Sequence, residues 1–279
     1  MDSLPICVEP GFFFTKPLAF VNTLAYNTFL LVIKMKLDNL FVFGCSLTKD
    51  NYQDTWADLI AQDYGLTLHN CAERGAGSDF VVRRLLTADI DPSNSLVMIM
   101  WPSADRFDLW ADWTVPHLLN DIEYASWADG SQPKFIDHYG NRSNQQGFIL
   151  NGTIPRGYKH YYHKFFYTAN QVAHDWYINV ITAQLYLKSK NIKFVMSSAF
   201  PIRNPIHHHD NTFITVPEIY NKIDLESFVD HSEHEGFFNY CADRNLPFFS
   251  TDHPDTQSHR HYVDNVLKSR YEHVTKENT

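Results

Sequence analysis

Short apolar runs alternate with longer amphipathic segments along the chain from Met35 onward. Runs such as LVMIMW and FVMSSAF are apolar almost without interruption, which is typical of parallel strands that are buried on both faces. Such runs predict strands at residues 40–43, 66–71, 96–101, 193–199 and 247–249. Between them, apolar residues recur at helical spacing, as in the segment that carries Trp56, Leu59, Ile60 and Tyr64.

This alternation predicts an α/β fold in three layers, α/β/α, with a mostly parallel, flavodoxin-like sheet of the five strands named above. Two long stretches rich in aromatic and polar residues interrupt it, at about residues 108–160 and 201–230. Loops of such length in a compact domain are usually functional, so we interpret both as insertions over one edge of the sheet. Residues 1–34 are interpreted as a leader, and residues 35–279 as one domain.

The leader contains a largely apolar stretch at residues 18–33, which Asn22, Thr23, Asn27 and Thr28 interrupt. This stretch falls short of the roughly 20 apolar residues that a spanning helix needs, and it lacks the basic start of a signal peptide. Both features argue against a membrane span. The expected location is cytoplasmic or virion-associated, and export stays open as an alternative.

Charge and cysteine content exclude several classes of function. A formal net charge of −9 without a cluster of Lys and Arg argues against nucleic-acid binding. The four cysteines are widely spaced and form no CxxC pair, which argues against zinc-ribbon and thioredoxin-type chemistry. Consecutive histidines such as His207, His208 and His209 rarely direct all their imidazoles to one ion. We therefore predict neither a metal site nor a cofactor.

Ligands of an open α/β sheet bind beyond the carboxyl ends of its strands, so the residues that follow each strand are the candidates for chemistry. The first strand runs into FGCSLT, where Gly44 allows a sharp turn and Ser46 could act as a nucleophile. A helix that starts near Asp54 could direct its amino end to the same place. The alternative is that Ser46 or Thr48 only bonds to the local backbone.

The second strand runs into NCAERGAGS, which contains two glycines just before a predicted helix. Gly75 and Gly77 would expose backbone N–H groups there, a suitable source of an oxyanion donor. The alternative is an ordinary glycine loop in which Ser78 caps the helix.

The third strand ends in WPSADRF, and three of its side chains are candidates. Ser103 could donate a hydrogen bond into the crevice, and Trp101 and Arg106 could bind a substrate. Alternatively, Arg106 pairs with Asp105 or Asp108 on the surface.

The fifth run is followed by STDHPDTQSH. His253 could remove the proton of a serine held after the first strand, and a nearby carboxylate, Asp252 or Asp255, could orient the imidazole. The alternative is a surface histidine at the start of a helix.

Taken in this order, FGCS, NCAERGAGS and DHP resemble the blocks of the SGNH (GDSL-like) hydrolase family, in its divergent members that read FGCS. The resemblance implies that Ser46 is the nucleophile and the first oxyanion donor, Gly75 the second donor and His253 the base. Two positions depart from the family pattern. Ser103 stands where the family has an asparagine donor, and Ser250 stands where it has the aspartate, which leaves Asp252 as the candidate third member.

The resulting hypothesis is a serine esterase that acts on a small-molecule or carbohydrate ester, with O-acetyl groups favoured by the habit of the family. Two alternatives stay open. One is a non-catalytic binding or structural module that kept the fold, and the other is an O-acyltransferase. The sequence assigns no oligomeric state.

Overall fold

The computed structural model describes residues 37–106, 108–112, 135–136, 142–143, 146–149, 168–206, 217–229, 235–249 and 253–276. By internal contacts the chain divides into Met1–Ile33 and Lys34–Thr279, and every described residue belongs to the second unit. The predicted leader therefore lies outside the described residues. Across the described ranges, no helix combines the length and apolar character needed to cross a bilayer.

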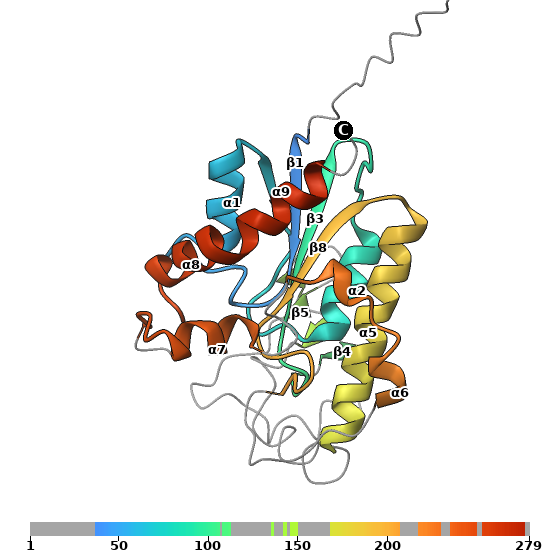
Figure 1. Cartoon of the computed structure of the whole chain (residues 1–279). Helices are drawn as coiled ribbons and strands as arrows, with labels where there is room; N and C mark the ends of the chain where they lie inside the picture. Colours follow the sequence, from blue (N-terminus) through green and yellow to red (C-terminus); the bar gives the residue numbers. More distant parts are fainter. Residues whose placement is uncertain are drawn as a thin grey trace, which may run out of the picture. The chain divides into compact units, whose positions relative to one another are not determined.

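The centre of the structure is a parallel sheet (Figure 1). Its strands are β1 (Asn39–Phe43), β2 (Thr67–Asn70), β3 (Ser95–Trp101) and β8 (Lys193–Ser198), in the order β2-β1-β3-β8. This is the predicted class, an α/β fold with a parallel sheet. The run at 247–249 does not join the sheet: Phe248 forms an isolated antiparallel bridge with Pro254, and the Phe249 N–H donates to the His253 carbonyl at 2.8 Å. The run therefore turns back on its own continuation, and Met196 of β8 forms a parallel bridge with Phe228 instead.

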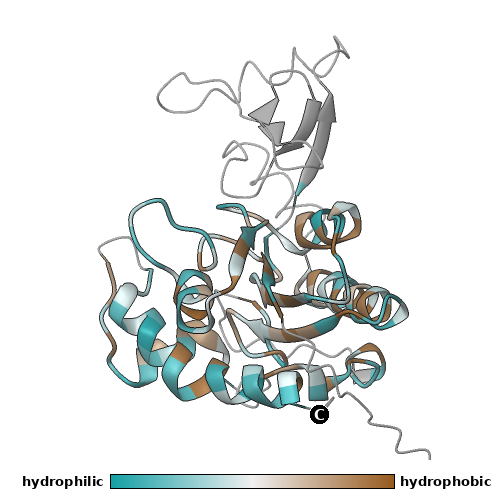
Figure 2. Cartoon of the chain, turned by 90° about the horizontal axis from the view of Figure 1, so that it is seen from above, coloured by the Kyte–Doolittle hydropathy of each residue, from teal (hydrophilic) through white to brown (hydrophobic). Residues whose placement is uncertain are grey.

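Helices cover both faces of this sheet, as the three-layer prediction requires (Figure 1). The helical elements are α1 (Trp56–Tyr64), α2 (Ser78–Thr87), α5 (Ala169–Ser189), α6 (Pro217–Tyr220), the 3₁₀ turn η3 (Leu225–Ser227), α7 (Gly236–Asp243), α8 (Thr256–Tyr262), the π-helical segment η4 (Val263–Leu267) and α9 (Lys268–Lys276). Helices α1, α7, α8 and α9 pack on one face, and α2 and α5 pack on the other. Figure 2 shows hydrophilic and hydrophobic stretches alternating along these helices, as expected of elements with one buried side.

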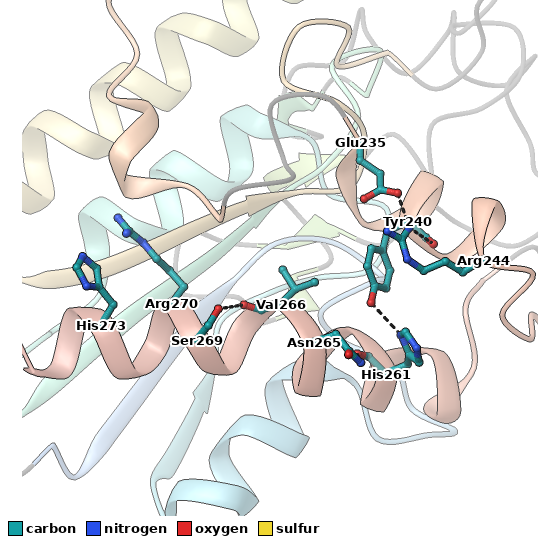
Figure 3. Close-up of a pocket in the computed structure, with 9 residues that line it drawn as sticks. All are labelled: Glu235, Tyr240, Arg244, His261, Asn265, Val266, Ser269, Arg270 and His273. Atoms are coloured by element: carbon teal, nitrogen blue, oxygen red, sulfur yellow. Dashed lines mark hydrogen bonds and ion pairs between the residues drawn. The ribbon is translucent and has the colours of Figure 1, made fainter.

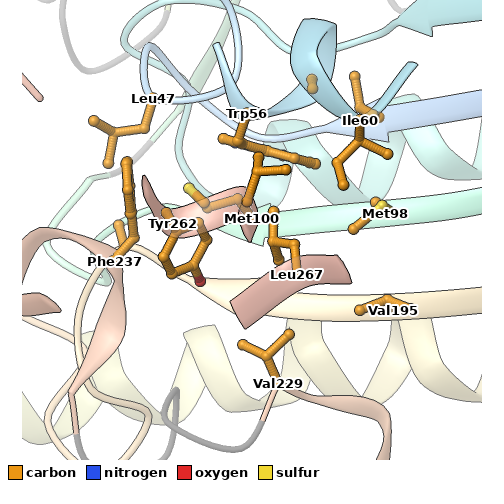
Figure 4. Packing of buried hydrophobic residues seen from close by; sticks show 14 of the residues in the cluster. Leu47, Trp56, Ile60, Met98, Met100, Val195, Val229, Phe237, Tyr262 and Leu267 are labelled. Carbon is orange, nitrogen blue, oxygen red and sulfur yellow. The ribbon is translucent and has the colours of Figure 1, made fainter. Parts of the chain in front are cut away.

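Alternation along β3 divides the core in two. Leu96, Met98 and Met100 belong to the cluster that includes α1 and α8, part of which Figure 4 shows. Val97, Ile99 and Trp101, which alternate with them, belong to the cluster under α2 and α5. All residues of β3 are buried, because successive side chains point to opposite faces and both faces are covered.

The region predicted as the first insertion contains strands that the sequence analysis did not predict. They are β4 (Leu109–Asp112), β5 (Phe135–Ile136), β6 (Arg142–Ser143) and β7 (Gln146–Ile149), and they form an antiparallel sheet in the order β4-β7-β5-β6. Strands of two to four residues contain too few alternating positions to be distinguished from loop by periodicity. In the second predicted insertion, helix α6 and the turn η3 lie within residues 217–229.

Gly44 is the point where the chain leaves β1, and it has no room for a side chain. Its φ is +155°, and an added Cβ would lie 2.8 Å from the carbonyl oxygen of Met100 and 2.3 Å from Thr48 Oγ1. The absence of a side chain at this position therefore allows the first-strand loop to cross close to β3.

We expect Gly44→Ala to lower the free energy of unfolding by about 3 kcal/mol, because a strained φ and contact with a backbone atom act together. Gly65→Ala is the matched control: its φ is +63°, but no atom lies within 4 Å of the added Cβ. Only the conformational cost of about 1 kcal/mol should remain there. Denaturant unfolding of both variants tests this expectation, and equal losses would contradict the close approach at Gly44.

Candidate active site

The sheet order places the loop after β1 between the loops after β2 and β3. In this loop the Thr48 and Lys49 N–H groups both donate to the Cys45 carbonyl, at 2.9 and 3.1 Å, which forms a tight turn around Ser46. Ser46 is only 9% exposed. Its Oγ lies 2.9 Å from Nε2 of His253, a residue 207 positions away in the chain. The structure thus brings together the two side chains that the sequence singled out as nucleophile and base.

The turn that carries Ser46 is fastened to the loop after β2. Asn70, the last residue of β2, donates through Nδ2 to the Thr48 carbonyl at 3.0 Å and accepts from the Ala72 N–H through Oδ1 at 3.1 Å. The Glu73 N–H donates to the Gly44 carbonyl at 3.2 Å. Asn70 therefore has a positioning role that the sequence analysis missed.

Gln53 joins the same turn to the segment that carries His253. Its Nε2 donates to the Pro254 carbonyl at 3.1 Å and to Asp50 Oδ2 at 3.2 Å, and its Oε1 accepts from Thr256 Oγ1 at 3.3 Å. Pro254 directly follows His253, so this one side chain links the base to the loop of the nucleophile. No motif marks a lone glutamine in a polar loop, and so the sequence analysis missed it.

The two carboxylates predicted to orient His253 have different outcomes. Asp252 lies outside the described residues, as does Ser250. Asp255 instead caps α8, because its side chain accepts from the Ser258 N–H at 2.9 Å.

Two backbone N–H groups are available as oxyanion donors. Among the residues that the structure describes, neither the Ser46 N–H nor the Gly75 N–H has a hydrogen-bond partner. Gly75 has a φ of +82°, in the left-handed region that favours glycine. Gly77, in contrast, is the N-cap of α2, and its N–H donates to both carboxylate oxygens of Asp108, at 2.9 and 3.0 Å. Ser78 does not cap the helix as its alternative reading predicted.

At the amino end of α1, two backbone N–H groups bond to side chains of the protein. The Trp56 N–H donates to His259 Nδ1 at 3.2 Å, and the Thr55 N–H donates to Asp58 Oδ2 at 2.8 Å. These two N–H groups are therefore already used within the fold.

The residues after β3 depart most from the predicted site. Ser103 is 2% exposed, and its Oγ donates to the Pro205 carbonyl at 3.2 Å, which uses its only proton. Trp101 is 0% exposed, packs edge-to-face on Trp176, and donates through Nε1 to Met196 Sδ at 3.4 Å. In this arrangement Ser103 is not an oxyanion donor and Trp101 is a core residue, which corrects both expectations.

Arg106 remains a candidate for substrate binding. Its Nη1 is buried and has no hydrogen-bond partner, so neither Asp105 nor Asp108 pairs with it in the described part of the chain. Asp108 instead holds the amino end of α2, where the Phe80 N–H also donates to its Oδ2 at 2.9 Å.

His259 is a second histidine close to the site. It is 1% exposed, and burial lowers its pKa to about 3; the Asp50 carboxylate opposes this lowering, and His253 adds a smaller lowering. The neutral ring accepts the Trp56 N–H through Nδ1. His259 therefore links the start of α1 to α8, the helix that follows His253.

The described residues contain no cluster of His, Cys, Asp and Glu that could hold a metal ion. His207, His208 and His209 lie outside them.

Comparison with known proteins found no matching family model and no matching curated protein. Among solved structures, the chain resembles one from Bacteroides fragilis that is named as an acylhydrolase, with 13% identity, a TM-score of 0.38, and coverage of 88% of this chain and 94% of that chain. It also resembles an acetyl xylan esterase from the rumen bacterium Butyrivibrio proteoclasticus, with 13% identity, a TM-score of 0.34, and coverage of 85% and 65%. Likeness at these values assigns no activity to this chain.

The low pKa of His259 predicts a pH dependence of stability. Because the folded-state pKa of about 3 lies below the ordinary value of 6.5, the neutral ring contributes stability that is fully present above about pH 6.5. That contribution falls by up to about 1.4 kcal/mol per pH unit as the pH drops toward 3.

Denaturant unfolding between pH 7 and pH 4 measures how the free energy of unfolding depends on pH. Over this range the slope should correspond to about one proton bound on unfolding. In His259→Gln the free energy of unfolding should depend less steeply on pH. His174→Gln is the control, because the side chain of His174 is 45% exposed. An equally steep dependence in wild type and His259→Gln would refute the assignment.

Proposed function

We propose that the chain is a serine hydrolase of the SGNH type that cleaves carboxylic esters through an acyl-enzyme on Ser46. The observation that carries the proposal is the 2.9 Å separation of Ser46 Oγ and His253 Nε2, which is hydrogen-bond reach for a nucleophile and its general base. The N–H groups of Ser46 and Gly75 support it, because they have no hydrogen-bond partner in the described part of the chain and acyl transfer requires donors for the developing oxyanion.

In the proposed reaction His253 Nε2 accepts the proton of Ser46 Oγ while the oxygen attacks the ester carbonyl. The N–H groups of Ser46 and Gly75 donate to the oxyanion of the tetrahedral intermediate. Protonated His253 then donates its proton to the departing alkoxide, which leaves an acyl group on Ser46. A water molecule, deprotonated by His253, attacks this ester and releases the carboxylic acid and the free serine.

For the substrate we propose an O-acetyl group on a carbohydrate or a comparable small ester. The resemblance of FGCS, NCAERGAGS and DHP to the family supports this choice. Arg106, with its unpartnered Nη1, is the candidate to orient a polar group of the substrate.

A catalytically weakened binding module is the second candidate, and the Ser103 hydrogen bond favours it. Because the Ser103 hydroxyl donates to the Pro205 carbonyl, only the backbone N–H groups of Ser46 and Gly75 remain as candidate oxyanion donors. The family pattern has a further side-chain donor. Loss of one such donor costs on the order of 10²–10³ in rate. An O-acyltransferase would share the acyl-enzyme step and would differ by transferring the acyl group to an alcohol in preference to water.

A fluorophosphonate probe tests the nucleophile directly. We expect a single adduct on Ser46, none on Ser46→Ala, and labelling at least about 100-fold slower in His253→Ala, because an unassisted hydroxyl is a weak nucleophile. Ser93→Ala is the control, since Ser93 is an exposed serine of a surface turn.

Hydrolysis of p-nitrophenyl acetate, with and without an added sugar alcohol, separates the candidates. Water-dependent release that requires Ser46 supports the esterase, whereas preferential acetylation of the alcohol indicates a transferase. Folded protein that neither labels at Ser46 nor hydrolyses the ester would leave only the binding module.

Gln53→Leu should slow fluorophosphonate labelling of Ser46 about ten-fold, because loss of orientation is costly even where the reacting groups are intact. The cause is loss of the bond to the Pro254 carbonyl, which fixes His253. Gln62→Leu removes an exposed glutamine of α1 and should have no effect. Unchanged labelling in Gln53→Leu would show that His253 is held by other contacts.

A further inference from the structure

A cavity of about 650 Å³ lies between α7 and the continuous run of α8, η4 and α9 (Figure 3). This volume is within the range of small-molecule sites. None of its lining residues belongs to the Ser46–His253 site, so nothing proposed above accounts for it.

Arg270 is the first sign that the cavity takes a ligand. Its Nε is buried and has no hydrogen-bond partner. A buried donor on a cationic group that is left unpaired costs free energy, and a bound acceptor would remove that cost. Figure 3 shows Arg270 and His273 projecting from α9 toward the same side.

His261, which also lines the cavity, forms a hydrogen bond with Tyr240. Its Nδ1 lies 2.8 Å from the hydroxyl of Tyr240. Either group can be the donor of this bond, depending on which ring nitrogen of His261 carries the hydrogen. In the tautomer that accepts at Nδ1, the hydrogen is on Nε2, and that nitrogen can donate to a ligand.

Among the described lining residues, Glu235 is the one carboxylate, and it is already paired with a cation. Glu235 Oε1 pairs with Arg244 Nη1, and the Arg244 guanidinium lies 3.9 Å from the centre of the Tyr240 ring. Arg270 therefore leaves the cavity with a surplus of positive charge, in a chain whose formal net charge is −9. Such a local reversal of sign favours an anionic ligand.

The π-helical segment η4 rotates the residues of α9 relative to those of α8. In an uninterrupted α-helix, His261 and Arg270 would differ by about 180° around the axis, at about 100° per residue. The extra residue of a π turn reduces the difference to about 80°, and brings His273 to within about 20° of His261. The π turn is seen in the hydrogen bond from the Lys268 N–H to the Val263 carbonyl, which spans five residues where an α-helix spans four. Such segments occur frequently at functional sites.

We propose that this cavity is a binding site for a small anion that carries a phosphate or carboxylate group. Arg270 donates to its oxygens, and His273 projects from α9 toward the same side as Arg270. The site is separate from the proposed catalytic one, so its test does not depend on hydrolysis.

Isothermal titration of the full chain with inorganic phosphate, and separately with citrate, measures binding at constant ionic strength. Saturable binding of either probe is expected, and the tighter one identifies the preferred group. Arg270→Gln should weaken that binding at least ten-fold. Arg83→Gln removes the same charge from an exposed position on α2 and should leave it unchanged. Absence of binding in wild type, or an equal loss in both variants, would overturn the proposal.

Glu235→Gln provides a test in the opposite direction. Removal of the carboxylate releases Arg244 toward the cavity, so the preferred anion should bind more tightly, by a few-fold or more. Thermal unfolding of each variant establishes that it is folded at the temperature of titration. Unchanged or weaker binding in folded Glu235→Gln would contradict the electrostatic basis of the site.

Discussion

The close approach of the chain at Gly44 to the carbonyl of Met100 is the constraint on which the candidate site depends. β1 lies between β2 and β3, and its end must turn within the space that these neighbours leave. Without a side chain at this position, the turn around Ser46 forms beside β3 and binds the loop after β2 through Asn70. Ser46 and the Gly75 loop thus meet at the carboxyl edge of the sheet, where α/β folds place their ligands.

The proposed nucleophile and base come from segments far apart in the chain, and polar contacts join these segments. Gln53 binds the backbone beside His253, and His259 binds the start of α1. Gln53 links the loop after β1 to the segment just before α8, and His259 links the start of α1 to α8. His259 does so as a buried neutral ring, which makes this link sensitive to acid. The loop that carries Ser46 and the segment that carries His253 are therefore coupled at the candidate site itself.

The helical run from α8 to α9 serves two regions of the molecule. Its amino end follows His253, its buried side completes the core with Tyr262 and Leu267, and its outer side lines the cavity with Arg270. The π turn permits this division, because it rotates the later residues relative to the earlier ones. A mutation within Val263–Leu267 would therefore change both the packing on the sheet and the proposed anion site.

The sequence by itself determined the class of fold and the pairing of Ser46 with His253. Continuous apolar runs require burial on both faces, which indicates the fold class. The order of FGCS, NCAERGAGS and DHP predicted the pairing of Ser46 with His253, although the run before His253 does not join the sheet. The tertiary structure alone decided how the neighbouring residues are used. Trp101 is buried in the core, and the Ser103 hydroxyl donates to the Pro205 carbonyl. The Gly77 N–H donates to Asp108, and the run at 247–249 forms a bridge with Pro254. Hydrogen-bond partners distant in the chain determined these outcomes, and a local pattern of residue types contains no information about which distant group will be within reach.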